Sequence, residues 1–289
     1  MVKKVTLYQV DAFTTKRFSG NPAAVCILEE TLSDDLMQQI AAEMNLSETA
    51  FIKRLPSSEG ILYSLRWFTP IVEIPLCGHG TVASAASLLE GEGINCTELH
   101  FQTRESGVLT VKRSADQLYH LSVPYLHPEP PSSAMQHLCT VSLEIILDSL
   151  PGAHCLAVRH NERVSKKVFI ALEGLSQEQF EAWKPPIDQL RAIPNGQGVI
   201  VSCAGQAGQP ELLLRFFAPW AGIDEDPVTG SAYAVAGPWW AKKLGKACFT
   251  ARQCSKRGGD LTITVDEASG RVDVAGGAIL VTKGSLLLD

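Results

Sequence analysis

The sequence predicts an α+β protein built from two pseudo-symmetric lobes, and three observations lead to this prediction. Short β-rich segments recur along the whole 289-residue chain, with few helical segments between them. Two runs of small residues, at 81–89 and 231–244, have the character of buried central helices. A proline-rich stretch without periodicity, residues 127–133, interrupts the pattern. We therefore expect an N-terminal lobe of residues 1–126 and a C-terminal lobe of residues 127–276.

The N-terminal lobe opens with two predicted strands. Residues 5–13 and 23–28 are β-rich, and Ser19-Gly20-Asn21-Pro22 between them consists of residues that favour turns. By the same criteria we expect further strands at residues 47–53, 62–68, 98–102, 107–113 and 117–123.

A surface helix is predicted over residues 33–44. Leu36, Ile40 and Met44 recur at helical spacing, so they form one apolar face. Ser33 precedes them as a candidate N-cap, and acidic residues follow it in the first turn, where they favour the positive end of the helix dipole.

The C-terminal lobe has the same style. Its predicted helices are residues 176–183 and 231–244, and its predicted strands are residues 156–160, 167–172, 198–203, 212–217, 260–265, 271–275 and 278–282.

Composition excludes several classes of protein. The net charge is −6 and the basic residues are scattered, so we expect no nucleic-acid partner. The longest apolar runs, 82–89 and 232–240, are shorter than the ~18 residues that span a bilayer, and the N-terminus lacks a signal-peptide core. We therefore expect a cytoplasmic protein without a membrane partner. The eight cysteines form no C-x-x-C pair, which predicts reduced thiols and no metal site.

An internal repeat indicates where a site lies. The segment Glu73-Ile74-Pro75-Leu76-Cys77-Gly78-His79-Gly80 aligns without a gap on Glu225-Asp226-Pro227-Val228-Thr229-Gly230-Ser231-Ala232, and upstream Arg66-Trp67-Phe68 is echoed by Arg215-Phe216-Phe217. Each copy leads from a strand through a glycine turn into a helix. Unpaired N–H groups at such a helix start favour anions. Two such turns facing each other would clamp a small anionic substrate.

Three acid-base candidates stand near these turns. Glu48 is the one carboxylate in an otherwise apolar and small-residue run; it is either a solvent-facing strand residue or, in a closed cleft, a proton carrier. His79 is either an exposed loop residue or a donor to a substrate oxygen. Asp226 either favours the start of the following helix or orients His79 or the substrate.

Two further turn residues have alternative interpretations. Ser231 is an N-cap, or its hydroxyl binds a ligand. A thiol at a helix start, as at Cys77, can act as a base, although packing is the simpler role. Thr229 occupies the equivalent place in the second copy, so the sequence disfavours a racemase with two facing thiols.

The chain resembles the phenazine-biosynthesis PhzF family, within the diaminopimelate epimerase-like superfamily. The segments that carry the resemblance are Asp11-Ala12-Phe13-Thr14, Phe18-Ser19-Gly20-Asn21-Pro22, Asn45-Leu46-Ser47-Glu48-Thr49-Ala50-Phe51, Phe68-Thr69-Pro70, Pro75-Leu76-Cys77-Gly78-His79-Gly80-Thr81, Phe217-Ala218-Pro219 and Glu225-Asp226-Pro227-Val228-Thr229-Gly230-Ser231. The resemblance implies that each lobe is a curled, mostly antiparallel sheet around a central helix. It also implies that residues 277–289 return to the first lobe and that the protein is a homodimer.

The resemblance assigns roles to the site residues. It implies that Glu48 shuttles a proton in the inter-lobe cleft, with His79 and Asp226 as polar partners. The substrate-contacting residues that it implies are Gly78, Gly80, Gly230 and Ser231. The expected activity is a cofactor-independent isomerisation of a small carboxylate.

Two other functions remain open on the sequence. One is a binding or regulatory protein that keeps the fold; agreement with the animal branch of the family implies a MAWD-type protein partner. The other is an amino-acid racemase or epimerase in which Cys77 acts alone.

Overall fold

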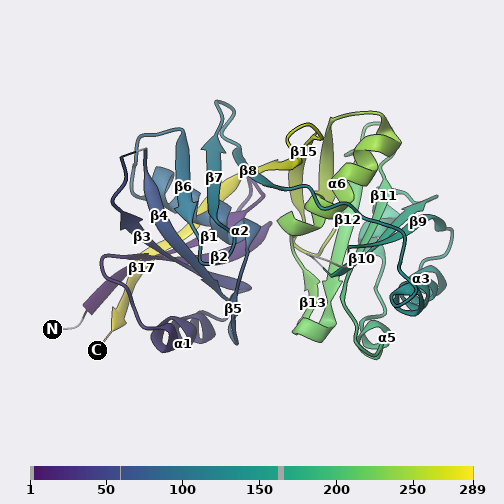
Figure 1. The fold of residues 1–289 in the computed structure, drawn as a ribbon, viewed down its shortest axis with the longest axis horizontal. Helices are drawn as coiled ribbons and strands as arrows, with labels where there is room; N and C mark the ends of the chain where they lie inside the picture. The colour runs from purple at the N-terminus through teal and green to yellow at the C-terminus, as the bar shows by residue number, and fades with distance from the viewer. Residues whose placement is uncertain (1–2, 59, 162–165, 289) are drawn as a thin grey trace. The chain divides into compact units, whose positions relative to one another are not determined.

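The computed structural model describes residues 3–58, 60–161 and 166–288, which form two compact units (Figure 1). The first unit comprises Met1–Ser122 together with Val274–Asp289, and the second comprises Val123–Asp273. Both ends of the chain thus belong to the first unit. No helix in the described ranges is long and apolar enough to cross a membrane.

The first unit is a mixed sheet in which antiparallel pairs dominate. Strand β1 pairs antiparallel with β2 and with the C-terminal strand β17, β2 pairs parallel with β3, β3 antiparallel with β4, β4 parallel with β6, and β6, β7 and β8 follow as antiparallel neighbours. The strands are β1 (Lys3–Ala12), β2 (Asn21–Leu28), β3 (Glu48–Leu55), β4 (Leu62–Phe68), β5 (Glu73–Ile74), β6 (Glu98–Gln102), β7 (Val108–Arg113), β8 (Tyr119–Pro124) and β17 (Ala278–Leu288).

Helix α1 (Asp34–Met44) lies where the sequence predicts it. The Ser33 hydroxyl caps it by accepting a hydrogen bond from the Leu36 amide at 3.3 Å. Its apolar face, with Met37 and Ile40, packs on buried side chains that include Phe51. The predicted cap is confirmed; of the predicted face, Ile40 is buried, whereas Leu36 and Met44 are partly buried against the same cluster.

Helix α2 (Gly78–Ala86) is the central helix of the first unit, and a single π-type turn, η1 (Ser87–Gly91), follows it. It begins at Gly78, three residues earlier than the predicted helix start, so the predicted glycine turn is the first turn of the helix itself. All its residues from His79 to Ala86 are buried. Small side chains allow the strands β1, β2 and β3 to pack closely around it.

The second unit repeats this arrangement. Strand β9 pairs antiparallel with β10, β10 parallel with β11, β11 antiparallel with β12, β12 parallel with β14, and β14 antiparallel with β15. The strands are β9 (His154–Asn161), β10 (Lys167–Glu173), β11 (Gly198–Ala204), β12 (Leu212–Ala218), β13 (Ile223–Asp226), β14 (Cys248–Gln253), β15 (Gly259–Asp266) and β16 (Arg271–Gly276).

Helix α6 (Gly230–Leu244) is the central helix of the second unit. A Cβ atom on its Gly237 would lie 3.2 Å from Ile263 of β15 and 3.6 Å from Val272 of β16, so these strands wrap closely around it. On the other side, Trp240 donates a hydrogen bond to Ser202 of β11 at 3.0 Å.

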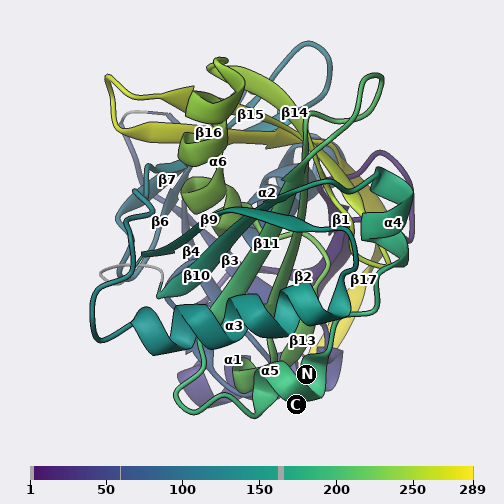
Figure 2. The same cartoon turned by 90° about the vertical axis from the view of Figure 1, so that its right-hand side faces the viewer.

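Helix α3 (Gln136–Ser149) is absent from the sequence-based prediction, which has no element between the proline-rich stretch and residue 156. Figure 2 shows it lying across the strands of the second unit. Its buried residues Leu138, Cys139, Ser142 and Ile146 follow a helical spacing. The prolines just before this segment indicate a linker, so the helical spacing that follows them is not part of the prediction. The short helix α5 (Ile187–Arg191) is also missing from the prediction, whereas α4 (Gln177–Ala182) lies where a helix is expected.

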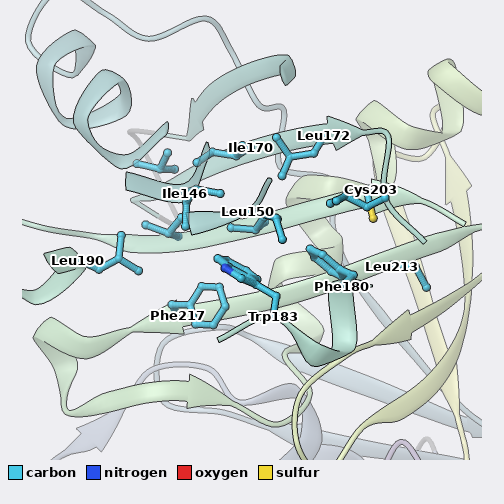
Figure 3. Close-up of a cluster of buried hydrophobic side chains, with 14 of the residues drawn as sticks. Ile146, Leu150, Ile170, Leu172, Phe180, Trp183, Leu190, Cys203, Leu213 and Phe217 are labelled. Carbon is cyan, nitrogen blue, oxygen red and sulfur yellow. The ribbon is translucent and has the colours of Figure 1, made fainter. Parts of the chain in front are cut away.

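The apolar core of the second unit lies between its sheet and these outer helices (Figure 3). Trp183 stacks on Phe180 and meets Phe217 of β12 edge to face, with ring centroids 6.0 and 5.6 Å apart. Ile146 of α3 and Leu190 of α5 belong to the same cluster. The sheet therefore has the outer helices on one face and α6 on the other.

The two units share one order of elements, as the internal repeat predicts. Trp67 of β4 pairs with Ile74 of β5, and the aligned Phe216 of β12 pairs with Asp226 of β13. Both central helices begin at the repeated glycine. The predicted α+β class is confirmed, with a mostly antiparallel sheet around one central helix in each unit.

Candidate active site

One cluster of candidate site residues, which we call half-site 1, lies in the first unit and consists of Asn21, Glu48, Cys77 and His79. Glu48 is the first residue of β3, and Asn21 is the first residue of β2, which runs parallel to it. His79 is in the first turn of α2, and Cys77 is the N-cap of that helix. The common direction of β2 and β3 brings their first residues to one end of the sheet, where α2 begins.

Glu48 and His79 are in direct contact. Glu48 Oε2 lies 2.8 Å from His79 Nε2, and the two residues are 8% and 5% exposed. The interpretations of Glu48 as a solvent-facing strand residue and of His79 as an exposed loop residue are therefore wrong. A buried carboxylate requires such a partner, because charge taken out of water without compensation is costly.

Asn21 fixes the orientation of the imidazole. Its amide Nδ2 lies 3.1 Å from His79 Nδ1, and the Ser47 hydroxyl lies 3.2 Å from its amide oxygen. With Nδ2 as donor, Nδ1 of a neutral ring accepts, so the ring proton is on Nε2 and faces Glu48. A doubly protonated ring requires the amide turned over. The Ser47 hydroxyl can donate or accept, so it serves both orientations.

The charge balance of half-site 1 favours a protonated histidine. Burial works against the imidazolium, but the interactions of His79 with the Cys77 and Glu48 side chains outweigh burial and hold the pKa of His79 well above its usual value. Burial, together with the charge of Glu48, raises the pKa of the Cys77 thiol. Cys77 is therefore a neutral thiol at ordinary pH, which makes Glu48 the main source of the negative charge beside His79.

Cys77 has a structural role at the helix start. Its sulfur accepts a hydrogen bond from the Gly80 amide at 3.3 Å and lies 3.5 Å from His79 Nδ1. A Cβ atom on Gly80 would come within 3.0 Å of this sulfur and 2.9 Å of Trp67. Close packing therefore requires a glycine at position 80. The sequence analysis expects a different role for Gly80, contact with the substrate. Gly78, also in the first turn, is half-buried.

Glu48, Cys77 and His79 also have the chemistry of metal ligands, since a donor atom from each lies within 4.8 Å of the others. Zinc–ligand bonds to nitrogen and oxygen are about 2.0–2.1 Å, which in a tetrahedral site puts two ligand atoms roughly 3.3 Å apart. The Glu48–His79 distance of 2.8 Å is shorter than this spacing between two ligand atoms. The raised pKa of His79 also opposes metal binding, which needs the neutral ring. The cluster fits a shared proton better than a metal ion.

A separate cluster, which we call half-site 2, lies in the second unit and contains the predicted residues Asp226, Gly230 and Ser231. Thr229 is the N-cap of α6, and its hydroxyl donates to an Asp226 carboxylate oxygen. The interpretation of Ser231 as the N-cap is therefore wrong: it is the second residue of the helix and half-buried.

Gln253, which the sequence analysis does not single out as a site residue, holds half-site 2 together. Its amide oxygen accepts from the Thr229 backbone N–H at 2.8 Å, and its amide nitrogen donates to the Asp226 carbonyl at 2.8 Å and to the Thr229 hydroxyl at 3.1 Å. It is fully buried at the end of β14. A buried glutamine is detectable only once the strand is placed beside the helix start.

Each unit has a matching Arg–Glu ion pair on the segments that lead into its half-site. Arg66 holds Glu73 through two hydrogen bonds of 2.7 Å, and Arg215 holds Glu225 at 2.6 and 2.9 Å. Both pairs are bidentate, the geometry in which arginine binds carboxylates most tightly. The repeated Arg and Glu of the sequence thus tie each strand to the segment that leads into the central helix.

The chain is similar to a known protein family over nearly its whole length. Residues 10–284 match the family described as phenazine biosynthesis-like protein, the PhzC-PhzF group. The chain belongs to the PhzF family. Among curated relatives of this PhzF-family protein, the phenazine biosynthesis-like domain-containing protein of Bos taurus is 41% identical, with 98% of this chain and 99% of the relative covered. A Pseudomonas aeruginosa protein named as an uncharacterised isomerase is 42% identical, with 99% of each covered.

Solved structures confirm the fold of this PhzF-family protein. A PhzF-family protein of Enterococcus faecalis superposes with a TM-score of 0.83 at 37% identity, with 98% of this chain and 99% of that chain covered. A hydroxyproline epimerase of Agrobacterium vitis gives a TM-score of 0.56 at 11% identity, with 99% and 93% covered, which shows a shared fold alone. The predicted diaminopimelate epimerase-like architecture is thereby confirmed.

Proposed function

We propose that this protein is a cofactor-independent isomerase of a small carboxylate, in which Glu48 removes a proton from one carbon and returns it to another. The observation that carries the proposal is the buried contact of 2.8 Å between Glu48 and His79. Relatives named as isomerases, at 42% and 39% identity over nearly the whole chain, support the reaction class.

The chemistry assigned to half-site 1 is proton transfer with no net change in charge. Glu48 accepts the proton as it leaves carbon, and the adjacent His79 stabilises the carboxylate before and after the transfer. Both ring nitrogens of His79 are engaged, Nε2 by Glu48 and Nδ1 by Asn21, so stabilising the carboxylate is the role that we assign to it. We propose Asp226 as a further polar group of the same reaction and the backbone at Gly78, Gly230 and Ser231 as contacts for the substrate carboxylate.

The test follows deuterium. A panel of cyclic and unsaturated carboxylates is incubated with the protein in D₂O, and exchange and isomer formation are measured by NMR. Glu48→Gln should lower the rate about 10²- to 10⁴-fold, the usual contribution of a general acid-base group. The exposed Glu43→Gln of α1 is the matched control and should retain the wild-type rate. Equal rates for Glu48→Gln and wild type would remove Glu48 from the mechanism.

A racemase that uses Cys77 is the second candidate, because its sulfur lies 3.5 Å from His79. Burial raises the pKa of this thiol, which is the wrong direction for a thiolate base. Thr229 caps α6 where Cys77 caps α2, so the second helix start supplies no thiol. We expect Cys77→Ser to retain more than about a tenth of the exchange activity, because serine is also a good N-cap. A loss as large as that of Glu48→Gln would favour the racemase.

The proposal includes a homodimer, which light scattering tests directly. The alternative of a binding protein is tested on the same variants. If Glu48→Gln and Asp226→Asn abolish turnover but leave capture of a MAWD-type partner unchanged, catalysis and partner binding are separate properties of this protein.

A further inference from the structure

Half-site 2 contains an ionisable side chain that the sequence does not reveal, Lys167, the first residue of β10. The order of strands gives its counterpart in the first unit. Glu48 of β3 lies opposite Ala23 of the parallel strand β2, and in the second unit Gly198 of β11 lies opposite Lys167 of the parallel strand β10. The next residues, Thr49 and Val199, pair with the repeated phenylalanines of β4 and β12. Gly198 therefore corresponds to Glu48, and Lys167 corresponds to Ala23.

The exchange of residues has a steric reason. A Cβ atom on Gly198 would lie 2.7 Å from the ring of Phe216 and 3.5 Å from Cγ of Lys167. The lysine stem and the ring thus occupy the space that a counterpart of Glu48 would need. Of these two neighbouring strands, the second unit therefore carries a basic side chain on β10, whereas the first unit carries an acidic side chain on β3.

The charged end of this lysine belongs to half-site 2. The Nζ atom of Lys167 lies 5.7 Å from the centroid of the Phe216 ring. Phe216 is on β12, and Asp226 of the neighbouring strand β13 lies directly opposite it. Burial lowers the pKa of Lys167 to about 8, and the Asp226 carboxylate opposes that shift. Its strand neighbours Asn161 and Gly198 carry no charge. The Asp226 carboxylate acts on the charge of Lys167.

We propose that Lys167 is a positioning residue of half-site 2, whose ammonium group balances the Asp226 carboxylate and must be charged for turnover. The inference rests on the proposed function through Asp226. It adds that the site has one carboxylate base in the first unit and a cation–carboxylate pair in the second. Loss of the lysine charge then sets the alkaline limit of activity.

The first experiment needs no substrate. With ¹³C-labelled lysine, the ε-carbon resonance of Lys167, assigned with Lys167→Arg, is titrated by NMR in wild type and in Asp226→Asn. We expect a midpoint near 8 in wild type and a lower midpoint in Asp226→Asn, since the carboxylate raises the pKa that burial lowers. An ordinary midpoint, or one unmoved by Asp226→Asn, would overturn the pairing whether or not the isomerase proposal is right.

The second experiment is the pH profile of exchange. Wild-type activity should fall above pH of about 8. Lys167→Arg, which keeps its charge, should retain activity and move this limb upward by at least one pH unit. Lys167→Met should lower the exchange rate about tenfold across the whole pH range. Its melting temperature should stay above the assay temperature, so that the variant is folded during the measurement. The exposed neighbour Lys166→Met is the matched control and should match wild type.

The outcomes separate the two proposals. An alkaline limb unchanged in Lys167→Arg, or full activity in Lys167→Met, would overturn the role of Lys167 while leaving Glu48 in place. Absence of any turnover in wild type would reject the proposed function, and the NMR titration would still decide whether Lys167 and Asp226 form a pair.

Discussion

Glu48 and His79 illustrate how a residue acquires its chemistry from its surroundings. In the sequence each has an ordinary interpretation, but in the structure both are buried and 2.8 Å apart. Asn21, from a third segment, fixes the ring. None of these three segments predicts the other two. The starts of the strands β2 and β3 and of the helix α2 meet only because α2 packs on both strands.

The raised pKa of His79 predicts a dependence of stability on pH. The pKa in the folded state lies above the unfolded value of about 6.5, so the stabilisation is complete below that pH and is lost as pH rises through the folded pKa. Each unit of difference is worth about 1.4 kcal/mol. In urea unfolding, the advantage of wild type over His79→Gln should therefore be largest at pH 6 and decline in alkaline buffer. A difference independent of pH would mean that folding leaves the pKa of His79 unchanged.

At the scale of elements, the starts of α2 and α6 show how a helix is placed. Both begin at the repeated glycine, and each is tied to its sheet by a bidentate Arg–Glu pair. The caps differ: Cys77 accepts from the backbone, whereas Thr229 gives its hydroxyl to Asp226. The same frame therefore presents a histidine–carboxylate pair in one unit and a carboxylate in the other.

Gly80→Ala tests the packing at the start of α2. The added Cβ would approach Trp67 to 2.9 Å and Cys77 to 3.0 Å. Overpacking costs about 1–3 kcal/mol, against a gain of about 1 kcal/mol in helix propensity. We expect a net loss of stability in chemical denaturation and a slower exchange reaction, since Trp67 and Cys77 must move and the Cys77 sulfur lies 3.5 Å from His79. Gly284→Ala in β17, whose Cβ would meet nothing within 4 Å, is the control and should cost nothing. An unchanged midpoint for Gly80→Ala would show that the helix start yields freely.

At the scale of the whole molecule, the first and last strands of the chain are neighbours in one sheet. β17 pairs with β1 along its length, from Ala12↔Ala278 to Lys3↔Leu288. The first unit thus depends on residues made last, which a scan of local periodicity cannot reveal, because pairing between distant segments leaves no local signal.

Deletion of residues 278–288 should therefore destabilise the first unit selectively. Hydrogen exchange should quicken in β1 and β2, while α3 and the strands of the second core keep their protection. Lys283→Met is the control: its ammonium donates at the surface to Glu92 and to the Gly91 carbonyl, so its loss should leave the protection of both units nearly unchanged. Equal loss of protection in both units would show that they unfold as one.

The sequence by itself determined the class of fold, the internal repeat, the helix cap at Ser33 and the residues that form both helix starts. These follow from local rules: β-rich runs, turn residues, helical spacing and N-caps. It missed α3, whose period stands next to prolines, and it could not detect Gln253 or Lys167. Tertiary structure decided the rest, namely the burial of Glu48, its contact with His79, the hydrogen bonds of Gln253 to Asp226 and Thr229, and the place of Lys167 beside Gly198, the counterpart of Glu48. Burial and charge balance are set by neighbours far away along the chain, so only the folded arrangement shows which of the polar residues are taken out of water together.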